Sequence, residues 1–352
     1  MALYINDSSI TTMATFITSL NTFLTTGGAG NPGWNADRLV TGSGEWAVSK
    51  NDATTGEDVE VAFQWDTGAP NALGIYQYHS GLGAGNYVSG SFPYGQVGDS
   101  GNGAASTTDG TIQTARHAII TNTPLQYWAF TGDTWAYVVV QTSSTDYVHF
   151  GFGVLDRFND WDGGAFAYGQ RNQSVTATDP AVSEGATVLL DGLLRDGSSP
   201  LPTSGQELHA ATVRCASLPG QVASGLWSVV MGNQTTLGND RQAVPKARGL
   251  FIGGYRGGQL ARETGVLLPS PSTGFVPGYP IQTMYWDKTN DEIYGPMGIM
   301  PGIRGISMQE FSAGDTFTIG SDSWMVFPSR KKDAGTSSSG TGNQGIMYLM
   351  ST

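Results

Sequence analysis

The first hydrophobic pattern along the chain has the spacing of a helix. Apolar residues recur three and four positions apart between residues 8 and 25, which places them on one helical face. These residues are Ile10, Met13, Ile17, Leu20 and Leu24. Asp7, Ser8 or Ser9 can cap the start, and the glycine pair at 27–28 can end the helix. The sequence therefore predicts a short amphipathic helix near the N-terminus.

After residue 44 the pattern changes to the period of a strand. The segment DVEVAFQW alternates apolar and polar residues, as a strand with one buried face does. Near the C-terminus, IGSDSW is a hairpin signal and GIMYLMST reads as a last short strand. Strand patterns at both ends of the chain favour a β-rich protein.

Three strand-like runs follow one another in the middle of the first half. They are LQYWAF, TWAYVVVQT and DYVHFGFGVL, separated by the short polar stretches TGD and SST. Such separators are turn candidates, so the runs predict a three-stranded antiparallel meander. The fold class expected for the whole chain is mainly β, with β-sandwich or barrel-like domains of short antiparallel strands and a short N-terminal amphipathic helix.

Residues 170–247 interrupt this strand texture. Stretches such as QRNQSVTATDPAVSEGA and LRDGSSPLPTSGQE are rich in turn-forming and polar residues. We therefore predict a helix and β domain at 1–169, a loop-rich insertion at 170–247 and a C-terminal β module at 248–352. No internal repeat of fixed period is visible.

Composition and charge narrow the class of protein. The chain has 50 glycines among 352 residues, 13% charged and 11% aromatic residues, which suits many strands joined by tight turns. Its net charge of -12 disfavours nucleic acid and anionic membranes as partners. The single cysteine, Cys215, allows no internal disulfide and fits a reducing compartment of synthesis. We see no signal peptide and no apolar run long enough for a membrane span.

The glycine-rich stretch YQYHSGLGAGNYVSG, residues 76–90, is the first candidate for chemistry. Its glycines have the spacing G-x-G-x-G, a strand pattern follows, and no lysine is near, so the phosphate-binding motifs do not fit. We interpret it as a strand-connecting turn, with His79 as a contact or packed residue. His117, His149 and His209 are scattered singly, and we expect His149 on the strand face opposite Tyr147. No catalytic site, cofactor or metal triad is predicted.

The segment DRFNDWDGG is the best candidate for a metal. Oxygen ligands followed by glycine suit calcium, and the ligands would be Asp156, Asp160 and Asp162. The EF-hand pattern fails because Phe158 and Gly169 stand at ligand positions. A solvated turn rich in Asp and Asn is the favoured interpretation, and a calcium loop of another type is the alternative.

Four blocks of the chain resemble a family of tailed-bacteriophage virion proteins. The meander at 125–158 carries the resemblance, together with LGIYQYHSGLGAGNYVSGSF at 73–92 and LFIGG at 250–254. EIYGPMGIMPGIRGIS, followed by GDTFTIGSDSWMVFPSRKK, resembles the C-terminal module of that family. The insertion at 170–247 lies outside the resemblance. The resemblance implies a structural role in assembly and no active site.

The function expected on this basis is that of a non-enzymatic structural subunit of the tail, neck or baseplate of a tailed phage. It would form a symmetric homo-oligomer, contact other virion proteins, and reside in the virion after assembly in the cytoplasm of the bacterial host. A receptor- or carbohydrate-binding protein on the virion surface is the alternative, with Trp and Tyr stacking on a host glycan. A polysaccharide depolymerase would need facing carboxylates, for which Asp160 and Asp291 are candidates.

Overall fold

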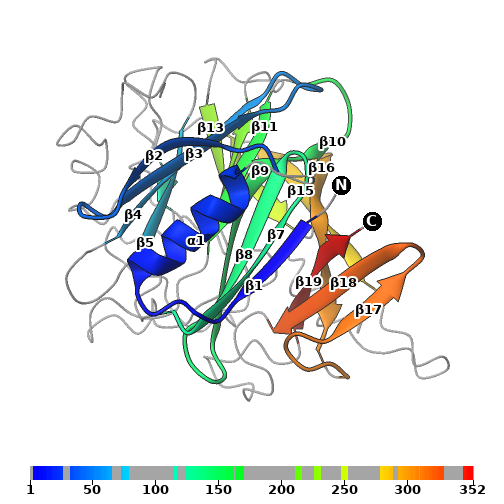
Figure 1. Ribbon diagram of the computed structural model, residues 1–352. Coiled ribbons are helices and arrows are strands. Elements are labelled where there is room, and N and C mark those ends of the chain that lie inside the picture. The colour runs from blue at the N-terminus through cyan, green and yellow to red at the C-terminus, as the bar shows by residue number, and fades with distance from the viewer. Residues whose placement is uncertain are drawn as a thin grey trace, which may run out of the picture.

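The computed structural model describes thirteen stretches of the chain, which hold one helix and the strands β1 to β19 in three antiparallel sheets (Figure 1). The prediction of a mainly β fold with a short N-terminal helix is confirmed. The described stretches are 3–26, 32–65, 73–78, 115–116, 124–161, 163–169, 211–215, 226–230, 247–252, 278–287, 292–308, 310–328 and 344–351.

The central sheet has seven strands in the order β1-β7-β8-β9-β11-β12-β13. Every neighbouring pair in it is antiparallel. Its strands are β1 (Leu3–Asp7), β7 (Gln126–Thr131), β8 (Trp135–Gln141), β9 (Tyr147–Val154), β11 (Gly163–Gly169), β12 (Ala211–Cys215) and β13 (Leu226–Val230). Strands β7, β8 and β9 are consecutive neighbours, which confirms the predicted meander.

The N-terminal sheet has five strands in sequence order. They are β2 (Asn35–Val40), β3 (Glu45–Asn51), β4 (Asp58–Trp65), β5 (Leu73–Tyr78) and β6 (Ala115–Arg116). On β4 the alternating residues Val59, Val61, Phe63 and Trp65 are all buried, as their period of two predicts.

The C-terminal sheet follows the order β14-β15-β16-β19-β18-β17, and β10 (Asp156–Arg157) pairs with β16 off this path. Its strands are β14 (Ala247–Ile252), β15 (Tyr279–Asp287), β16 (Glu292–Ser307), β17 (Thr316–Ile319), β18 (Asp322–Pro328) and β19 (Gln344–Ser351). The β17–β18 hairpin turns at Gly320 and Ser321, between the paired Ile319 and Asp322, where the sequence predicts it.

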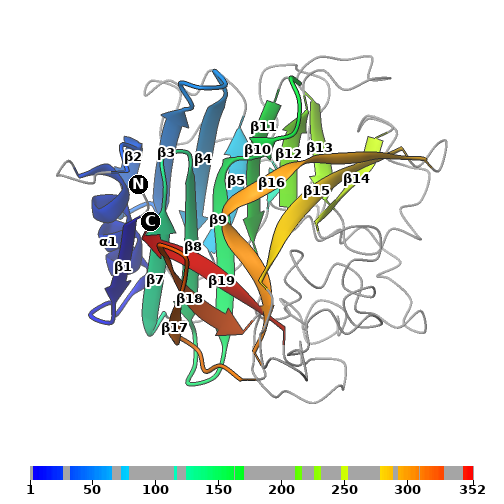
Figure 2. The ribbon, with the colours of Figure 1, turned by 90° about the vertical axis from the view of Figure 1, so that its right-hand side faces the viewer.

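The three sheets stack with the central sheet in the middle (Figures 1 and 2). On β8, Val138 and Val140 join an apolar core with the N-terminal sheet. Tyr137 and Val139, on the other face of the same strand, join a second core with the C-terminal sheet. Because both faces are covered, β8 is hydrophobic at nearly every position and does not alternate with polar residues.

Helix α1 (Met13–Thr25) packs into the core between the central and N-terminal sheets. All five residues of its predicted apolar face are buried. The predicted cap at residues 7–9 is wrong, because the chain there still belongs to the end of β1 and a turn. Thr12 caps the helix instead: its hydroxyl accepts from the Thr15 amide at 3.1 Å, and the Thr15 hydroxyl accepts from the Thr12 amide at 2.9 Å. This helix is too short to cross a bilayer, and no other helix lies in the described stretches.

The sheets cross the boundaries of the three predicted segments. Strands β12 and β13 fall within 170–247 and extend the central sheet beyond β11. Strand β10, from the first segment, pairs with β16 of the third. The division of the chain at 169 and 247 stays a prediction. The cores on the two faces of the central sheet show how the first segment packs within itself and against the third segment.

Candidate functional site

His149 is a fully buried titratable residue of the central sheet. It lies on β9 with none of its surface exposed. Its neighbours Val148 and Phe150 face the N-terminal sheet, whereas Tyr147 and His149 face the C-terminal sheet. The expectation that His149 lies opposite Tyr147 is therefore wrong, because residues two positions apart on a strand share a face.

Both ring nitrogens of His149 bind the C-terminal sheet. Nε2 lies 2.9 Å from the carbonyl oxygen of Pro328, and Nδ1 lies 2.6 Å from the hydroxyl of Tyr348. A carbonyl can only accept, so Nε2 carries the proton, and Nδ1 of the neutral ring accepts from the Tyr348 hydroxyl. Burial lowers the pKa of His149 to about 4, against a smaller opposing effect of the Pro328 hydrogen bond. With both nitrogens engaged, the ring acts as a link between sheets.

A second polar cluster ties α1 to the central sheet. The Ser19 hydroxyl donates to Asp7 at 2.5 Å, and the Tyr127 hydroxyl lies 2.8 Å from the Ser19 oxygen. Hydrogen bonds from Ser19 and Ser9 hold the pKa of Asp7 below its usual range. Burial raises the pKa of Tyr127 to about 12, with the Asp7 charge adding to the effect. The cluster therefore links α1 to β1 and β7 of the central sheet.

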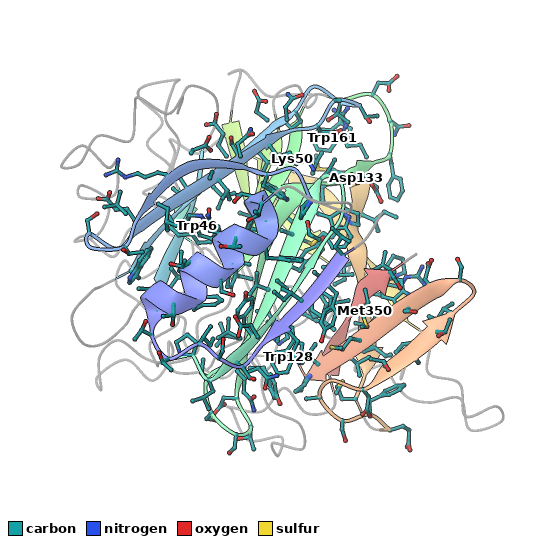
Figure 3. The ribbon with its side chains drawn as sticks, viewed as in Figure 1. Trp46, Lys50, Trp128, Asp133, Trp161 and Met350 are labelled. Atoms are coloured by element: carbon teal, nitrogen blue, oxygen red, sulfur yellow. The ribbon has the colours of Figure 1, made fainter. Side chains whose placement is uncertain are left out.

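Charged residues also gather where β3 ends, near Asp133 in the β7–β8 turn (Figure 3). Lys50 donates to the carbonyl of Pro32 and lies 5.9 Å from the centre of the Trp34 ring. Burial lowers the pKa of Lys50, while the charges of Asp133 and Asp52 raise it. Asp52 itself accepts from the amide of Thr54 at 3.0 Å, so its carboxylate shapes the turn after β3.

The predicted calcium ligands are only partly described. Asp156 and Asp160 are exposed, the first on β10 and the second in the turn that follows. Asp162 lies outside the described residues. Within the described stretches, no group of three or more His, Cys, Asp or Glu is placed to hold a metal ion. The calcium interpretation stays a prediction.

The side chain of Arg157 stabilises the same turn. The Arg157 guanidinium donates to the carbonyls of Trp161 and Gly163 and lies 5.8 Å from the centre of the Trp161 ring. The Trp161 indole N–H donates to the carbonyl of Met297 at 3.2 Å. The turn is thus attached to β16 through an aromatic side chain.

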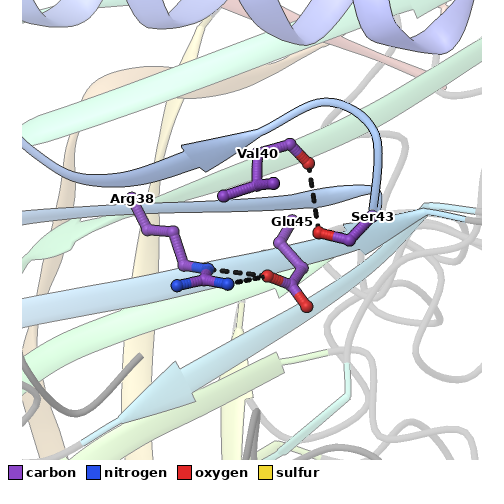
Figure 4. Close-up of polar contacts among 4 residues, drawn as sticks. All are labelled: Arg38, Val40, Ser43 and Glu45. Atoms are coloured by element: carbon purple, nitrogen blue, oxygen red, sulfur yellow. Dashed lines mark hydrogen bonds and ion pairs between the residues drawn. The ribbon is translucent and has the colours of Figure 1, made fainter. Parts of the chain in front are cut away.

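The β2–β3 hairpin contains a nearly buried ion pair between Arg38 and Glu45 (Figure 4). Arg38 Nε donates to Glu45 Oε2 at 2.6 Å, and the side chains are 14% and 7% exposed. The Ser43 hydroxyl donates to the Val40 carbonyl at 3.4 Å in the connecting turn. The pair holds the edge strand β2 against β3.

Several residues singled out in the sequence fall outside the described stretches: His79 with the rest of the glycine-rich loop at 79–90, His117, His209 and Asp291. The role of His149 could have been anticipated in part, since its spacing from Tyr147 puts both on one face. Its partner Tyr348 is 199 positions away and has no local sequence signal. Comparisons with models of known protein families and with curated proteins find no match.

Proposed function

We propose that this protein is a non-enzymatic structural subunit of a tailed-phage particle, in the tail, neck or baseplate, and that it assembles as a symmetric oligomer. The β-rich architecture is compatible with this function but does not require it. The link to phage particles comes from the resemblance of the four sequence blocks.

One observation carries the non-enzymatic part of the proposal. Within the described stretches, the polar groups treated above as candidates for chemistry hold elements together. His149 joins two sheets, Ser19 and Asp7 join α1 to the central sheet, and Asp52 shapes a turn. A catalytic base or nucleophile needs a lone pair directed at a substrate, and these groups direct theirs at the protein.

Assembly is supported by the strand edges. Within the described residues, β17 pairs on one side only, with β18. Thr316 and Thr318 are exposed on it, and Phe317 and Ile319 are half-buried. An open edge offers unpaired backbone groups to a neighbouring chain. The β17–β18 hairpin also lies at the periphery of the molecule, where a neighbour can reach it (Figure 1).

A carbohydrate-binding protein on the virion surface is the second candidate, and Trp161 is the residue that favours it. This side chain is half-buried at the surface, next to exposed Asp160. A sugar needs an open aromatic face, however, and Arg157 already lies over the Trp161 ring. Among side chains that the structure describes, the exposed large hydrophobics are Val40 and Leu125, neither of which is aromatic. The structural function is therefore better supported.

Two measurements together test the proposal. Mass photometry of the purified chain is expected to show a defined oligomer, and mass spectrometry of purified particles is expected to detect the chain in fixed stoichiometry. A stable monomer that is absent from particles would contradict the structural function. Binding to a glycan array by a chain on the particle surface would instead favour the carbohydrate-binding function.

A further inference from the structure

We propose that the contact of His149 with Tyr348 and Pro328 is an acid-sensitive junction, at which protonation of the imidazole uncouples the C-terminal sheet from the central sheet. This inference goes beyond the proposed function and does not depend on it, because it concerns how two layers of the same chain are held together.

The His149 ring lies at the interface between the central sheet and the C-terminal sheet. His149 belongs to β9 in the middle of the central sheet, while Pro328 ends β18 and Tyr348 lies in β19. The ring also stacks on Tyr348, with centroids 6.0 Å apart and planes at 11°. Tyr348 in turn stacks on Phe130 of β7 at 4.8 Å. The histidine is therefore part of the main packing contact between the two sheets.

Protonation breaks the hydrogen-bond pattern of this site. A protonated ring donates from both nitrogens, so Nδ1 can no longer accept from the Tyr348 hydroxyl. The hydroxyl must turn its own proton away from the ring, and the new charge lies in a site without solvent access. Each of these changes weakens the contact between β9 and β19.

The described groups nearest to His149 are neutral between pH 4 and pH 6.5. In the core that Tyr348 joins, the titratable side chains nearest to this contact are the phenols of Tyr147 on β9, Tyr137 on β8 and Tyr348 on β19. Strand β18 contributes the Pro328 carbonyl. The charged residues that are buried within the described stretches, Glu45, Asp52 and Glu57, belong to the N-terminal sheet and its turns, and the basic residues Arg330, Lys331 and Lys332 that follow Pro328 lie outside the described residues.

The sign of the pH effect follows from where the proton binds more tightly. The unfolded chain takes up a proton on His149 near pH 6.5, whereas burial holds the pKa in the folded protein at about 4. The neutral ring stabilises the packed sheets above pH 6.5, and this stabilisation is lost as the pH falls from 6.5 towards 4. Helix α1, which packs between the central and N-terminal sheets, has no titratable side chain, so its protection is expected to stay unchanged while the C-terminal sheet loses protection.

Hydrogen exchange of the full chain, measured by mass spectrometry between pH 6.5 and pH 4, tests the junction. After correction for intrinsic exchange rates, peptides from 322–328 and 344–351 are expected to lose at least tenfold protection. Peptides from 13–25 in helix α1, which have no titratable side chain, serve as the internal reference and are expected to keep theirs. Equal loss in all three peptides would indicate general acid unfolding and would overturn the proposal.

His149→Gln is the matched variant, because glutamine offers one donor and one acceptor and cannot take up a proton in this range. Its protection in 344–351 is expected to be independent of pH, and a profile equal to that of the natural protein would overturn the proposal. Tyr348→Phe is the control: it is expected to weaken protection at every pH and to reduce the pH dependence without removing it, because the charge on His149 is still buried.

If His149→Gln does not fold, the proposal is tested by NMR titration of the histidines in the natural protein. One of the four imidazoles is expected to titrate far below pH 6.5, together with the loss of protection in 344–351. Titration of all four near pH 6.5 with the sheets still packed would contradict the proposal.

Discussion

Trp135 lies against three glycines and leaves no room for a side chain at those positions. A Cβ added at Gly132 would lie 2.5 Å from the Trp135 ring, and one at Gly153 would lie 2.7 Å from the Trp135 Cα. A Cβ at Gly302, on β16 of the other sheet, would also overlap the ring. Gly302 has a φ of +72°, which other residues rarely adopt. These glycines let the two sheets approach around a tryptophan.

Gly302→Ala is expected to lower the free energy of unfolding by about 2–4 kcal/mol, because left-handed backbone strain adds to overpacking of the ring. Chemical denaturation measures the change. Gly320→Ala, at φ +64° with open space around it, is expected to cost only about 1 kcal/mol. Gly42→Ala, also in open space, is the neutral control. Equal effects of the three variants would show that the Trp135 packing is not the cause.

The Arg38–Glu45 pair gives a second prediction at single-residue scale. Glu45→Ala is expected to cost about 3 kcal/mol, because it leaves a nearly buried guanidinium without its carboxylate. The double variant Arg38→Met with Glu45→Leu is expected to recover part of this loss, since no charge then remains buried. Urea denaturation of the single and double variants measures the coupling. If the loss of unfolding free energy in the double variant equals the sum of the losses in the single variants, the two side chains act independently.

At the scale of elements, helix α1 depends on its capping box. Thr12→Ala is expected to lower the unfolding free energy by about 1 kcal/mol, because the Thr15 amide loses its acceptor. Thr18→Ala, on the exposed face of the same helix, is the control and is expected to be neutral or slightly stabilising. Thermal unfolding followed by circular dichroism compares them. A loss in the control as large as that in Thr12→Ala would argue against the cap.

Strand β17 gives the prediction for assembly. Thr316→Lys combined with Thr318→Lys places two charges on exposed positions of an open edge, which discourages pairing with another chain. Mass photometry is expected to show at least tenfold weaker association with the monomer still folded. Thr18→Lys, on the exposed face of α1, adds the same kind of charge elsewhere and is expected to leave association unchanged. Unchanged association of the β17 variant would place the contact at another surface.

Most elements could be predicted because each has a local pattern. Helix α1 has its apolar spacing, β4 its alternation, and the β17–β18 hairpin its turn residues. The predicted cap of α1 at 7–9 differs from the observed cap at Thr12 because the serine, aspartate and threonine residues between 7 and 12 all have side chains that can cap a helix. Only the path of the chain shows that Asp7 still belongs to β1 and that Thr12 is the cap.

At the scale of the whole molecule, the stacking of three sheets has no local pattern. The run WAYVVVQ on β8 indicates a strand buried on both faces, but the sequence does not show which strands cover it. Contacts such as His149 with Tyr348, or the Tyr137 hydroxyl with the Pro301 carbonyl at 2.7 Å, join residues more than 160 positions apart. The motifs of the sequence disfavour the candidate sites, whereas the structural use of the polar residues could be seen only in the fold.

The assembled particle provides the most direct test of the proposed function. A cryo-EM map of complete phage particles purified from cells that produce this chain would show whether it is part of the particle and with what symmetry. The account predicts density for the three stacked sheets, repeated around a symmetry axis of the tail, neck or baseplate. Complete particles whose map and protein content lack this chain would contradict it.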